Sequence, residues 1–201
     1  MDTANTRVLF IDLQYDFTRE GGKEFKPRPC VDFIRKTAVP FLMNNPIEVA
    51  EIVSDYRQPR PGDRGDCCHP GEWGYTSEIH ENLKRSWVWI KCMNSPVWTR
   101  RSAGHHKKEP ELPHPAPEAF GSWTLNTLGN PGTTVVLAGL TLDCCVLCAA
   151  QELNWRGYDV KILREGTDTY SGSAKEKEYL LSHPPITNWA TPISWKMFTG
   201  G

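Results

Sequence analysis

A strand that runs almost directly into a helix is the feature that most constrains the fold of this 201-residue chain. Residues 133–140 form a β-branched and aliphatic run, which predicts a buried strand. The run breaks at Gly139-Leu140-Thr141, and a helical pattern opens at Asp143, the predicted N-cap. A strand that is followed at once by a helix is typical of α/β folds.

The same alternation recurs along the chain. Further apolar runs predict strands at residues 8–11, 47–54, 87–90 and 158–163. Helical spacing of apolar residues predicts helices at residues 31–43, 123–128, 144–157 and 174–181. Surface loops are expected at residues 57–75 and 100–117, and an extended segment at residues 186–195. This order predicts an α/β fold with a doubly wound, mainly parallel sheet flanked by helices on both faces (a Rossmann-like three-layer sandwich), in a single domain over residues 1–201.

The charge balance and the cysteines exclude several classes of protein. Lys and Arg number 23 and Asp and Glu 24, so neither a nucleic-acid partner nor an anionic membrane partner is expected. The first apolar run, residues 8–11, is too short for a signal peptide or a membrane span. The 7 cysteines include two adjacent pairs, Cys67-Cys68 and Cys144-Cys145, which do not suit a regular disulfide framework. We therefore expect a soluble protein of the reducing cytoplasm.

Cys145 is the first candidate for chemistry. It lies in the first turn of the helix that follows the strand at residues 133–140. At that position the peptide dipoles and free N–H groups favour a thiolate over a thiol, and the same N–H groups can stabilise an oxyanion. The alternative is that Cys145 is an inert residue that packs as a small hydrophobe.

Two more chemically capable residues follow predicted strands. Asp12 comes directly after residues 8–11, and Lys91 directly after residues 87–90. Because ligands of open α/β sheets bind outside the carboxyl ends of the strands, we expect Asp12, Lys91 and Cys145 at one edge. Asp12 can accept the thiol proton and return it to a leaving amine, while Lys91 can stabilise both anions. Taken singly, Asp12 could be a helix cap and Lys91 a surface lysine.

Three motifs around these residues resemble those of one known family. Asp12-Leu-Gln-Tyr-Asp-Phe17 is similar to D-x-Q-x-D-F, and Lys91 with Ser95 is similar to K-x-x-x-S. Gly139-Leu-Thr-Leu-Asp-Cys-Cys-Val146 is similar to G-x-x-T-D-x-C-V. The sequence thus resembles the isochorismatase-like cysteine hydrolases, which include nicotinamidases and N-carbamoylsarcosine amidases. The order and spacing of the motifs agree from residue 8 to about residue 170.

The resemblance implies a role for each of these residues. Cys145 would be the nucleophile, because the family's cysteine lies six positions after the glycine. Cys144 is the rival candidate, and Cys148 is expected to pack in the core. Asp12 would act as general base and acid, and Lys91 would complete the catalytic triad.

The resemblance also implies an unusual turn before the nucleophile. The family commonly has a non-proline cis peptide there, which in this chain would join Leu140 to Thr141. That turn directs the N–H of Thr141 toward an oxyanion, beside the N–H of Cys145. Leu142 departs from the family pattern, which often has threonine, and so removes a hydroxyl but no catalytic atom.

Aromatic residues near the active edge are candidates for the substrate pocket. Phe17 resembles the aromatic residue that lines the pocket of the family, and Gln14 belongs to the same motif. Trp73 and Trp98 lie close to the expected active edge. Aromatic walls would suit an aromatic or heterocyclic amide.

Arginines and a broken metal motif occupy the loop at residues 57–75. Arg57, Arg60 and Arg64 either pair with a carboxylate of the substrate or belong to a solvated loop. Nicotinamidases of the family bind a metal through an Asp-x-His pair and a later His, whereas this chain has Asp55-Tyr-Arg57. Arginine cannot ligate a metal, so no metal or other cofactor is expected. A different zinc site, of non-standard spacing, remains open at Cys67, Cys68, His69 and His80.

The function implied by the resemblance is that of a cysteine hydrolase. Such an enzyme cleaves the C–N bond of a small carboxamide or carbamoyl compound through a thioester, and the family implies a homo-oligomer. Two alternatives stay open. One is vinyl-ether hydrolysis of isochorismate, which needs no cysteine nucleophile, and the other is a non-catalytic binding module.

Overall fold

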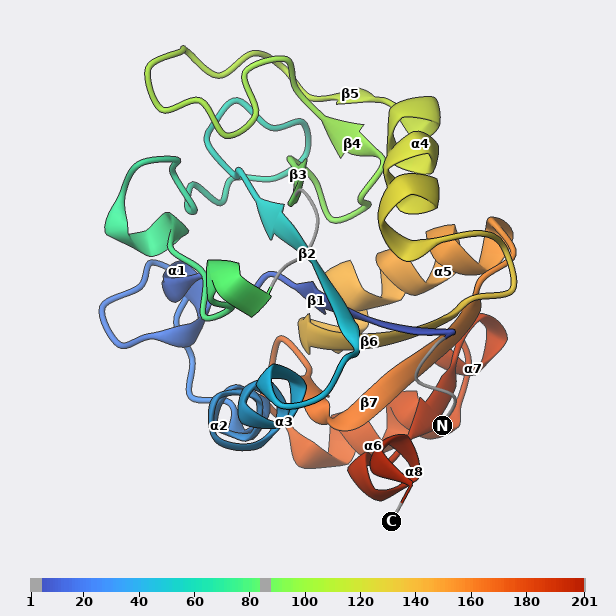
Figure 1. The fold of residues 1–201 in the computed structure, drawn as a ribbon. Helices are drawn as coiled ribbons and strands as arrows, with labels where there is room; N and C mark the ends of the chain where they lie inside the picture. The colour runs from blue at the N-terminus through green and yellow to red at the C-terminus, as the bar shows by residue number, and fades with distance from the viewer. Residues whose placement is uncertain (1–4, 84–87, 201) are drawn as a thin grey trace.

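A six-stranded parallel sheet forms the centre of the molecule, seen in a computed structural model that describes residues 5–83 and 88–200 (Figure 1). Its strands are β1 (Thr6–Ile11), β2 (Glu48–Ser54), β3 (Trp89–Lys91), β6 (Thr134–Leu140), β7 (Asp159–Asp168) and β8 (Thr191–Ile193). Their order across the sheet is β3-β2-β1-β6-β7-β8, and every neighbouring pair is parallel. The predicted strand at residues 87–90 starts with Trp87, which lies outside the described residues.

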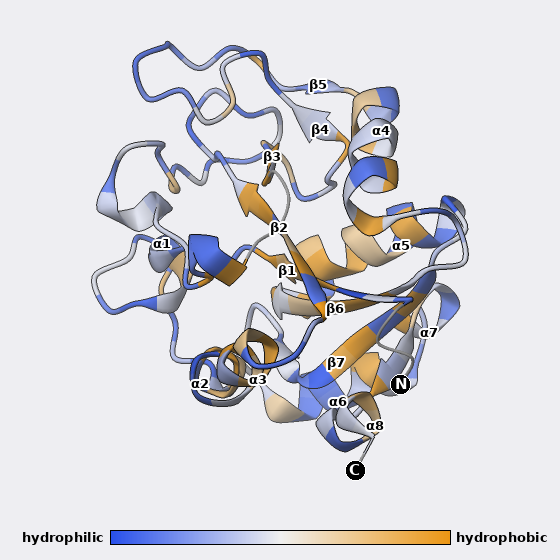
Figure 2. Ribbon diagram, viewed as in Figure 1, coloured by the Kyte–Doolittle hydropathy of each residue, from blue (hydrophilic) through white to orange (hydrophobic). Residues whose placement is uncertain are grey.

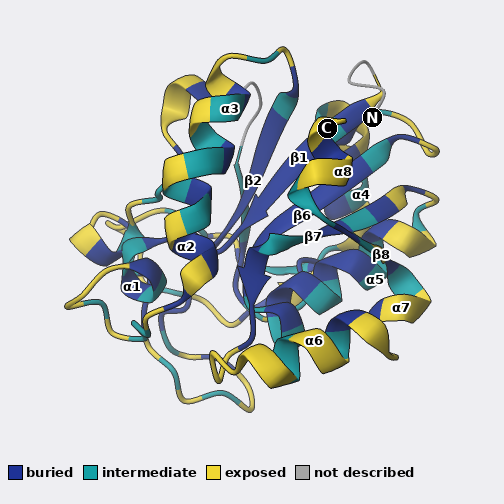
Figure 3. Ribbon diagram, turned by 90° about the horizontal axis from the view of Figure 1, so that it is seen from below, coloured by how far each residue is buried: buried dark blue, intermediate teal, exposed yellow. Residues whose placement is uncertain are grey.

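Helices cover both faces of the sheet (Figures 1 and 3). One face packs against a continuous helical run and the C-terminal helix: α2 (Pro29–Phe33), η1 (Ile34–Ala38), α3 (Val39–Met43) and α8 (Trp195–Thr199). The other face packs against α4 (Pro117–Leu128), α5 (Leu147–Trp155), α6 (Ala174–Ser182) and α7 (Ile186–Trp189). Shorter elements are α1 (Tyr15–Thr18), η2 (Trp73–Tyr75), η3 (Glu81–Leu83), η4 (Leu142–Val146) and the antiparallel pair β4 (Trp98–Thr99) and β5 (His114–Pro115). The predicted three-layer α/β fold is confirmed.

The alternation of side chains along the strands explains why both faces are covered. In β1, Val8 and Phe10 pack on the face of α2 and α3, whereas Leu9 and Ile11 pack on the face of α4 and α5. Figure 2 shows the strands as predominantly hydrophobic, and Figure 3 shows them buried between helices whose outer sides are exposed. Both faces of the sheet therefore carry apolar side chains, and a helical layer on each face is needed to bury them.

The order of the strands places a crevice between β1 and β6. The chain adds β2 and β3 on one side of β1, and then β6, β7 and β8 on the other. Gly139 of β6 lies opposite Ile11 of β1 with φ +127°, and a Cβ at Gly139 would lie 2.0 Å from the Ile11 carbonyl oxygen. Only glycine permits this approach. The carboxyl ends of β1 and β6 thus meet at the reversal of strand order, where open α/β sheets bind ligands.

Three local predictions were wrong. The helix after β6 begins at Leu142, so its N-cap is Thr141 rather than Asp143. The side chain of Asp143 instead accepts a hydrogen bond from the Tyr170 N–H (2.9 Å). The predicted helix at residues 123–128 starts earlier, at Pro117, where proline is favoured in the first turn. The segment at residues 186–195 is not extended throughout, since it contains α7 before β8.

The described part of the chain holds no helix with both the length and the apolar character that crossing a bilayer requires.

Candidate active site

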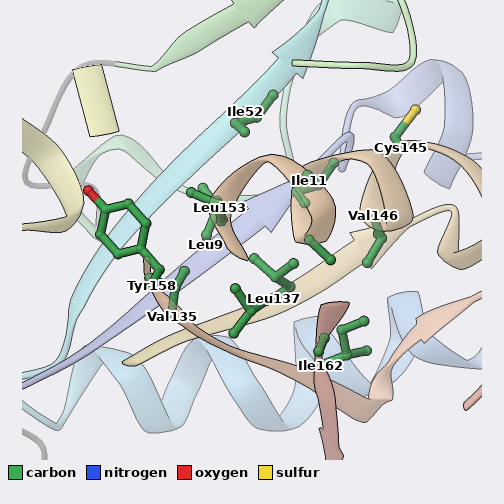
Figure 4. Packing of buried hydrophobic residues seen from close by; sticks show 14 of the residues in the cluster. Leu9, Ile11, Ile52, Val135, Leu137, Cys145, Val146, Leu153, Tyr158 and Ile162 are labelled. Carbon is green, nitrogen blue, oxygen red and sulfur yellow. The ribbon is translucent and has the colours of Figure 1, made fainter. Parts of the chain in front are cut away.

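The carboxyl ends of β1, β3 and β6 bring the three predicted catalytic residues together. Asp12 directly follows β1, Lys91 is the last residue of β3, and Cys145 lies in η4 just after β6. The Nζ of Lys91 is 2.8 Å from Asp12 Oδ2 and 3.3 Å from Cys145 Sγ. All three residues are buried, so their charges act on one another with little screening by water. Figure 4 shows Cys145 at the edge of the core cluster, with its sulfur directed away from the packed side chains.

Ser54, the last residue of β2, fixes the Asp12–Lys91 pair. Its Oγ donates a hydrogen bond to Asp12 Oδ1 (2.8 Å) and accepts one from Lys91 Nζ (2.8 Å). Asp12 has φ +53°, and its N–H donates to the carbonyl of Ile52 in β2 (3.0 Å). Each carboxylate oxygen of Asp12 therefore has a partner, and the side chain is held in one position beside the thiol.

Tyr56 completes the contacts of the thiol. Its hydroxyl accepts a hydrogen bond from Lys91 Nζ and lies 3.3 Å from Cys145 Sγ and 3.4 Å from Asn94 Oδ1. The sequence analysis missed Tyr56, treating it only as the spacer between Asp55 and Arg57. The available signal was a polar-tipped aromatic residue two positions after a buried strand.

Burial governs the protonation of these groups. It raises the pKa of the Cys145 thiol, and the positive charge of Lys91 opposes this only in part. Burial alone would lower the pKa of Lys91, but the neighbouring Asp12 and Cys145 outweigh it and raise that pKa. Burial also raises the pKa of Tyr56, which stays a neutral phenol. Burial thus works against the preformed thiolate that the helix N-terminus alone would favour.

The turn before Cys145 contains the implied cis peptide. The bond from Leu140 to Thr141 is cis, and η4 starts one residue later. Leu140, Thr141 and Cys145 all line a cavity of about 500 Å³. The other lining residues come mainly from loops: Asp12, Phe17, Glu24, Arg28, Tyr56, Arg60, Asp63, Arg64, Gly65, Cys67, Asn94, Cys144 and Tyr170. The backbone of the turn thus borders the same space as the thiol.

Solved structures of several hydrolases share this arrangement of elements. An isochorismatase-like hydrolase from Alkaliphilus metalliredigens is 19% identical, covers 97% of both chains and has a TM-score of 0.68. N-carbamoylsarcosine amidase from Thermoplasma acidophilum is 19% identical over 94% of this chain and 95% of that one, with a TM-score of 0.62. Nicotinamidase from Bacillus subtilis is 19% identical over 94% and 98%, with a TM-score of 0.60. The chain has the isochorismatase-like fold. No protein-family model and no curated protein matches the sequence.

Of the residues predicted to bind substrate, Phe17 lines the cavity of this isochorismatase-like fold, and so do Arg60 and Arg64, for which pairing with a substrate carboxylate was one of two alternatives. Gln14 is fully buried and supports the scaffold, because its side chain bonds both the N–H and the carbonyl of Ser54. Trp73 is 51% exposed and packs on Tyr15. Gln14, Trp73, Trp98 and Arg57, also predicted to bind substrate, are not among the residues that line this cavity.

Trp98 and Arg57 lie away from the cavity, because both contact residues that are distant in the sequence. Trp98 lies in β4 and packs against the core cluster of the α4–α5 face. Arg57 pairs with Asp55 through two hydrogen bonds, Nε to Oδ1 (2.8 Å) and Nη2 to Oδ2 (2.7 Å). It also donates to the carbonyls of Ser102 (3.2 Å) and Lys108 (3.0 Å), so it ties the loop that carries them to β2.

The residues at Asp55 do not fit a metal of the kind implied by the nicotinamidase resemblance. Both Asp55 oxygens face Arg57, and the N–H of Gly104 also donates to Oδ2 (3.1 Å). A guanidinium offers only donors, so it neutralises Asp55 without adding a ligand.

The alternative zinc set does not assemble either. The only cluster with ligand atoms close enough among the described residues joins Asp16, Cys67 and Cys68, without His69 or His80. His69 instead bonds Asp66 (2.7 Å).

Removal of Arg57 is expected to destabilise the protein. Arg57→Ala leaves the fully buried Asp55 carboxylate unpaired, which should lower the free energy of unfolding by about 3–5 kcal/mol in urea denaturation. Lys36→Ala, which removes an ion pair with both side chains mostly exposed, is the matched control and should cost at most about 1 kcal/mol. The double variant Asp55→Asn/Arg57→Met should recover part of the loss. If Arg57→Ala lowered the free energy of unfolding no more than Lys36→Ala does, the Asp55–Arg57 pair would not stabilise the fold as expected.

Removal of the Tyr56 hydroxyl is expected to make the thiol less reactive. The hydrogen bond from Tyr56 lowers the pKa of Cys145, so Tyr56→Phe should raise that pKa. A hydrogen bond to a charged group contributes about 1.5–3 kcal/mol, so iodoacetamide should alkylate Cys145 roughly 10-fold more slowly or worse between pH 6 and 9. Mass spectrometry of the Cys145 peptide measures the rate. Tyr158→Phe is the control, since that buried hydroxyl donates to the remote Gly129 carbonyl (2.7 Å). If Cys145 were alkylated at the same rate in Tyr56→Phe and Tyr158→Phe, Tyr56 would have no role in the reactivity of the thiol.

Proposed function

We propose that the protein is a cysteine amidohydrolase that cleaves the C–N bond of a small carboxamide or carbamoyl compound through a thioester on Cys145. The observation that carries the proposal is the contact network of Asp12, Lys91 and Cys145 beside a cavity of about 500 Å³. A cavity of this size suits a small molecule. The network lies at the reversal of strand order, where this class of fold binds ligands.

In the first half of the reaction, Asp12 accepts the proton of the Cys145 thiol as sulfur attacks the carbonyl carbon. Lys91 keeps its charge and stabilises the sulfur anion as it forms. The backbone N–H groups of Thr141 and Cys145 are the proposed donors to the oxyanion. Asp12 then returns the proton to the nitrogen, so that ammonia or an amine leaves and a thioester remains.

In the second half, water attacks the thioester. Asp12 accepts a proton from the water, and the thioester carbon becomes that of a carboxylic acid or a carbamic acid. The sulfur leaves as a thiolate and takes the proton back from Asp12. Each step uses only groups of the chain and one water, and it restores the resting thiol.

The names of the structural neighbours are consistent with this chemistry. The neighbours include a nicotinamidase, a pyrazinamidase and an N-carbamoylsarcosine amidase. Vinyl-ether hydrolysis is a weaker candidate, because it gives no role to a buried thiol that contacts Lys91 and Tyr56. A pure binding module likewise leaves the buried Asp12–Lys91 pair without a purpose, at a cost in desolvation.

The cell compartment and assembly are further proposals. All 7 cysteines are free in the structure, which supports a reducing cytoplasm. The homo-oligomer implied by the family resemblance stays a prediction, which the mass of the protein in solution would test.

The experiment that tests the function combines product release with trapping of the intermediate. A panel of small carboxamides and carbamoyl compounds is incubated with the protein, and ammonia is measured in a coupled assay. With a substrate from that panel, rapid acid quenching should leave an acyl group on the Cys145 peptide in mass spectra. Pyruvate without ammonia from isochorismate would instead support vinyl-ether hydrolysis, and no product from any compound would support the binding module.

A further inference from the structure

We propose that the substrate carries a carboxylate in addition to its amide, and that Arg60 recognises it. This proposal rests on the proposed function and names its substrate class. The loop between β2 and η2 brings the Arg60 side chain to the wall of the cavity, where only 2% of it is exposed. A buried guanidinium at the edge of a catalytic cavity needs acceptors for its N–H groups.

Arg60 has donors that the protein itself does not use. Its Nη2 pairs with Asp63 Oδ1 (2.7 Å) and donates to the Gly65 carbonyl (3.3 Å). Its Nε and Nη1 are buried and have no hydrogen-bond partner in the described part of the chain. A guanidinium N–H that lacks an acceptor can donate a charge-assisted hydrogen bond to a carboxylate oxygen.

Tyr56 connects this cation to the reacting sulfur. The Arg60 Cζ lies 3.8 Å from the centre of the Tyr56 ring, and the hydroxyl of the same ring lies 3.3 Å from Cys145 Sγ. One tyrosine ring therefore separates the proposed carboxylate site from the nucleophile. A compound with a short spacer between amide and carboxylate fits this separation and the cavity of about 500 Å³.

The charges around the cavity favour an anion. Apart from the Asp12–Lys91 pair, the lining contains three guanidinium groups and two carboxylates: Arg28, Arg60, Arg64, Glu24 and Asp63. Asp63 Oδ1 accepts from Arg60 and from the Gly65 N–H (2.7 Å), so the charge of Asp63 is partly neutralised within the loop.

Arg28 adds to the positive charge of the cavity. It is buried, and the hydrogen bonds found for it in the described structure go to the carbonyls of Phe17, Thr169 and Tyr170. No carboxylate oxygen is among these acceptors, so the Arg28 guanidinium adds positive charge to the side of the cavity that it lines.

Matched substrates provide the first test. Succinamate is compared with succinamide, and 3-carbamoylbenzoate with isophthalamide, so that each pair differs only by a carboxylate in place of a second amide. Charge-assisted hydrogen bonds predict that kcat/KM for at least one carboxylate compound exceeds that of its neutral partner by about 10- to 100-fold. Equal values in both pairs, or a preference for an amide that carries an amine, would overturn the proposal.

Variants assign the preference to one residue. Arg60→Gln and Arg60→Met should abolish the preference, because kcat/KM of the carboxylate compound falls to that of its neutral partner, while circular dichroism checks the fold. Arg101→Gln, an exposed arginine outside the cavity, is the control and should keep the preference. A preference that persists in both Arg60 variants would overturn the assignment to Arg60.

A binding assay separates this proposal from the proposed function. Succinate and isophthalate, which have no amide, are titrated calorimetrically into the Cys145→Ala variant and into the same variant with Arg60→Gln. Binding that is at least about 10-fold weaker with Arg60→Gln supports the carboxylate site even if no amide is hydrolysed. Amide hydrolysis without any carboxylate binding or preference would keep the function and discard the site.

Discussion

Replacement of Cys145 by alanine is expected to lower amide hydrolysis by about 10⁴- to 10⁶-fold, the scale at which other acyl-transfer enzymes lose activity with their nucleophile. Cys145 Sγ contacts Lys91 Nζ and the Tyr56 hydroxyl, and it lies at the cavity wall, so no other thiol shares its electrostatic setting. The variant removes the atom that forms the thioester. Ammonia release under saturating substrate measures the loss, and the acyl adduct on the Cys145 peptide should disappear with it.

Two neighbouring cysteines provide the controls for this result. Cys148 lies one turn further along the helix and does not border the cavity, so Cys148→Ala should retain activity within a fewfold range. Cys144 does border the cavity, but burial together with Asp143 raises its pKa more than the positive charge of Lys91 lowers it. If Cys144→Ala abolished hydrolysis and Cys145→Ala did not, the nucleophile would be Cys144. Activity that survives both variants would rule out a thioester mechanism.

The positions of the catalytic candidates could be predicted because each one directly follows a strand. An apolar run that ends in Asp12 or Lys91 marks the carboxyl end of a buried strand, and parallel strands bring those ends to one edge. The order of the strands need not be known for this step. The prediction used only local patterns and one topological rule, which is why the fold and these three positions could be read from the sequence.

The walls of the cavity could not be predicted in the same way. They come from the loop after β2, whose polar composition resembles that of a solvated segment. The start of this loop is buried because Arg57 ties Asp55 to carbonyls some 45 or more residues away, as in its bond to Ser102. Hydrophobic periodicity carries no information on such contacts, so the burial of Arg60 and the position of Tyr56 were missed. The prediction for Trp73 shows the opposite case. Trp73 is close to the active edge in sequence, yet its side chain lies on the surface.

Replacement of Asp12 by asparagine is expected to lower hydrolysis by about 10²- to 10⁴-fold, because asparagine keeps the shape but cannot accept and return the proton. The same change removes the counter-ion of the buried Lys91, whose ammonium is 2.8 Å from Asp12 Oδ2. We therefore also expect a lower free energy of unfolding, by about 3–5 kcal/mol if no other group compensates the charge. Single-turnover rates and urea denaturation measure the two effects.

Alkylation of Cys145 distinguishes the proposed base from a residue that only supports the structure. The negative charge of Asp12 helps to raise the pKa of Cys145, whereas the positive charge of Lys91 lowers it. Asp12→Asn removes the first influence and keeps the second, so the thiolate becomes the natural counter-ion of Lys91 and its population should rise. Iodoacetamide should then label Cys145 faster than in the unaltered protein, while hydrolysis falls. Opposite changes in the two rates are required if Asp12 moves the proton, since damage to the site as a whole would slow both. Slower labelling together with slower hydrolysis would therefore reduce Asp12 to a structural partner of Lys91.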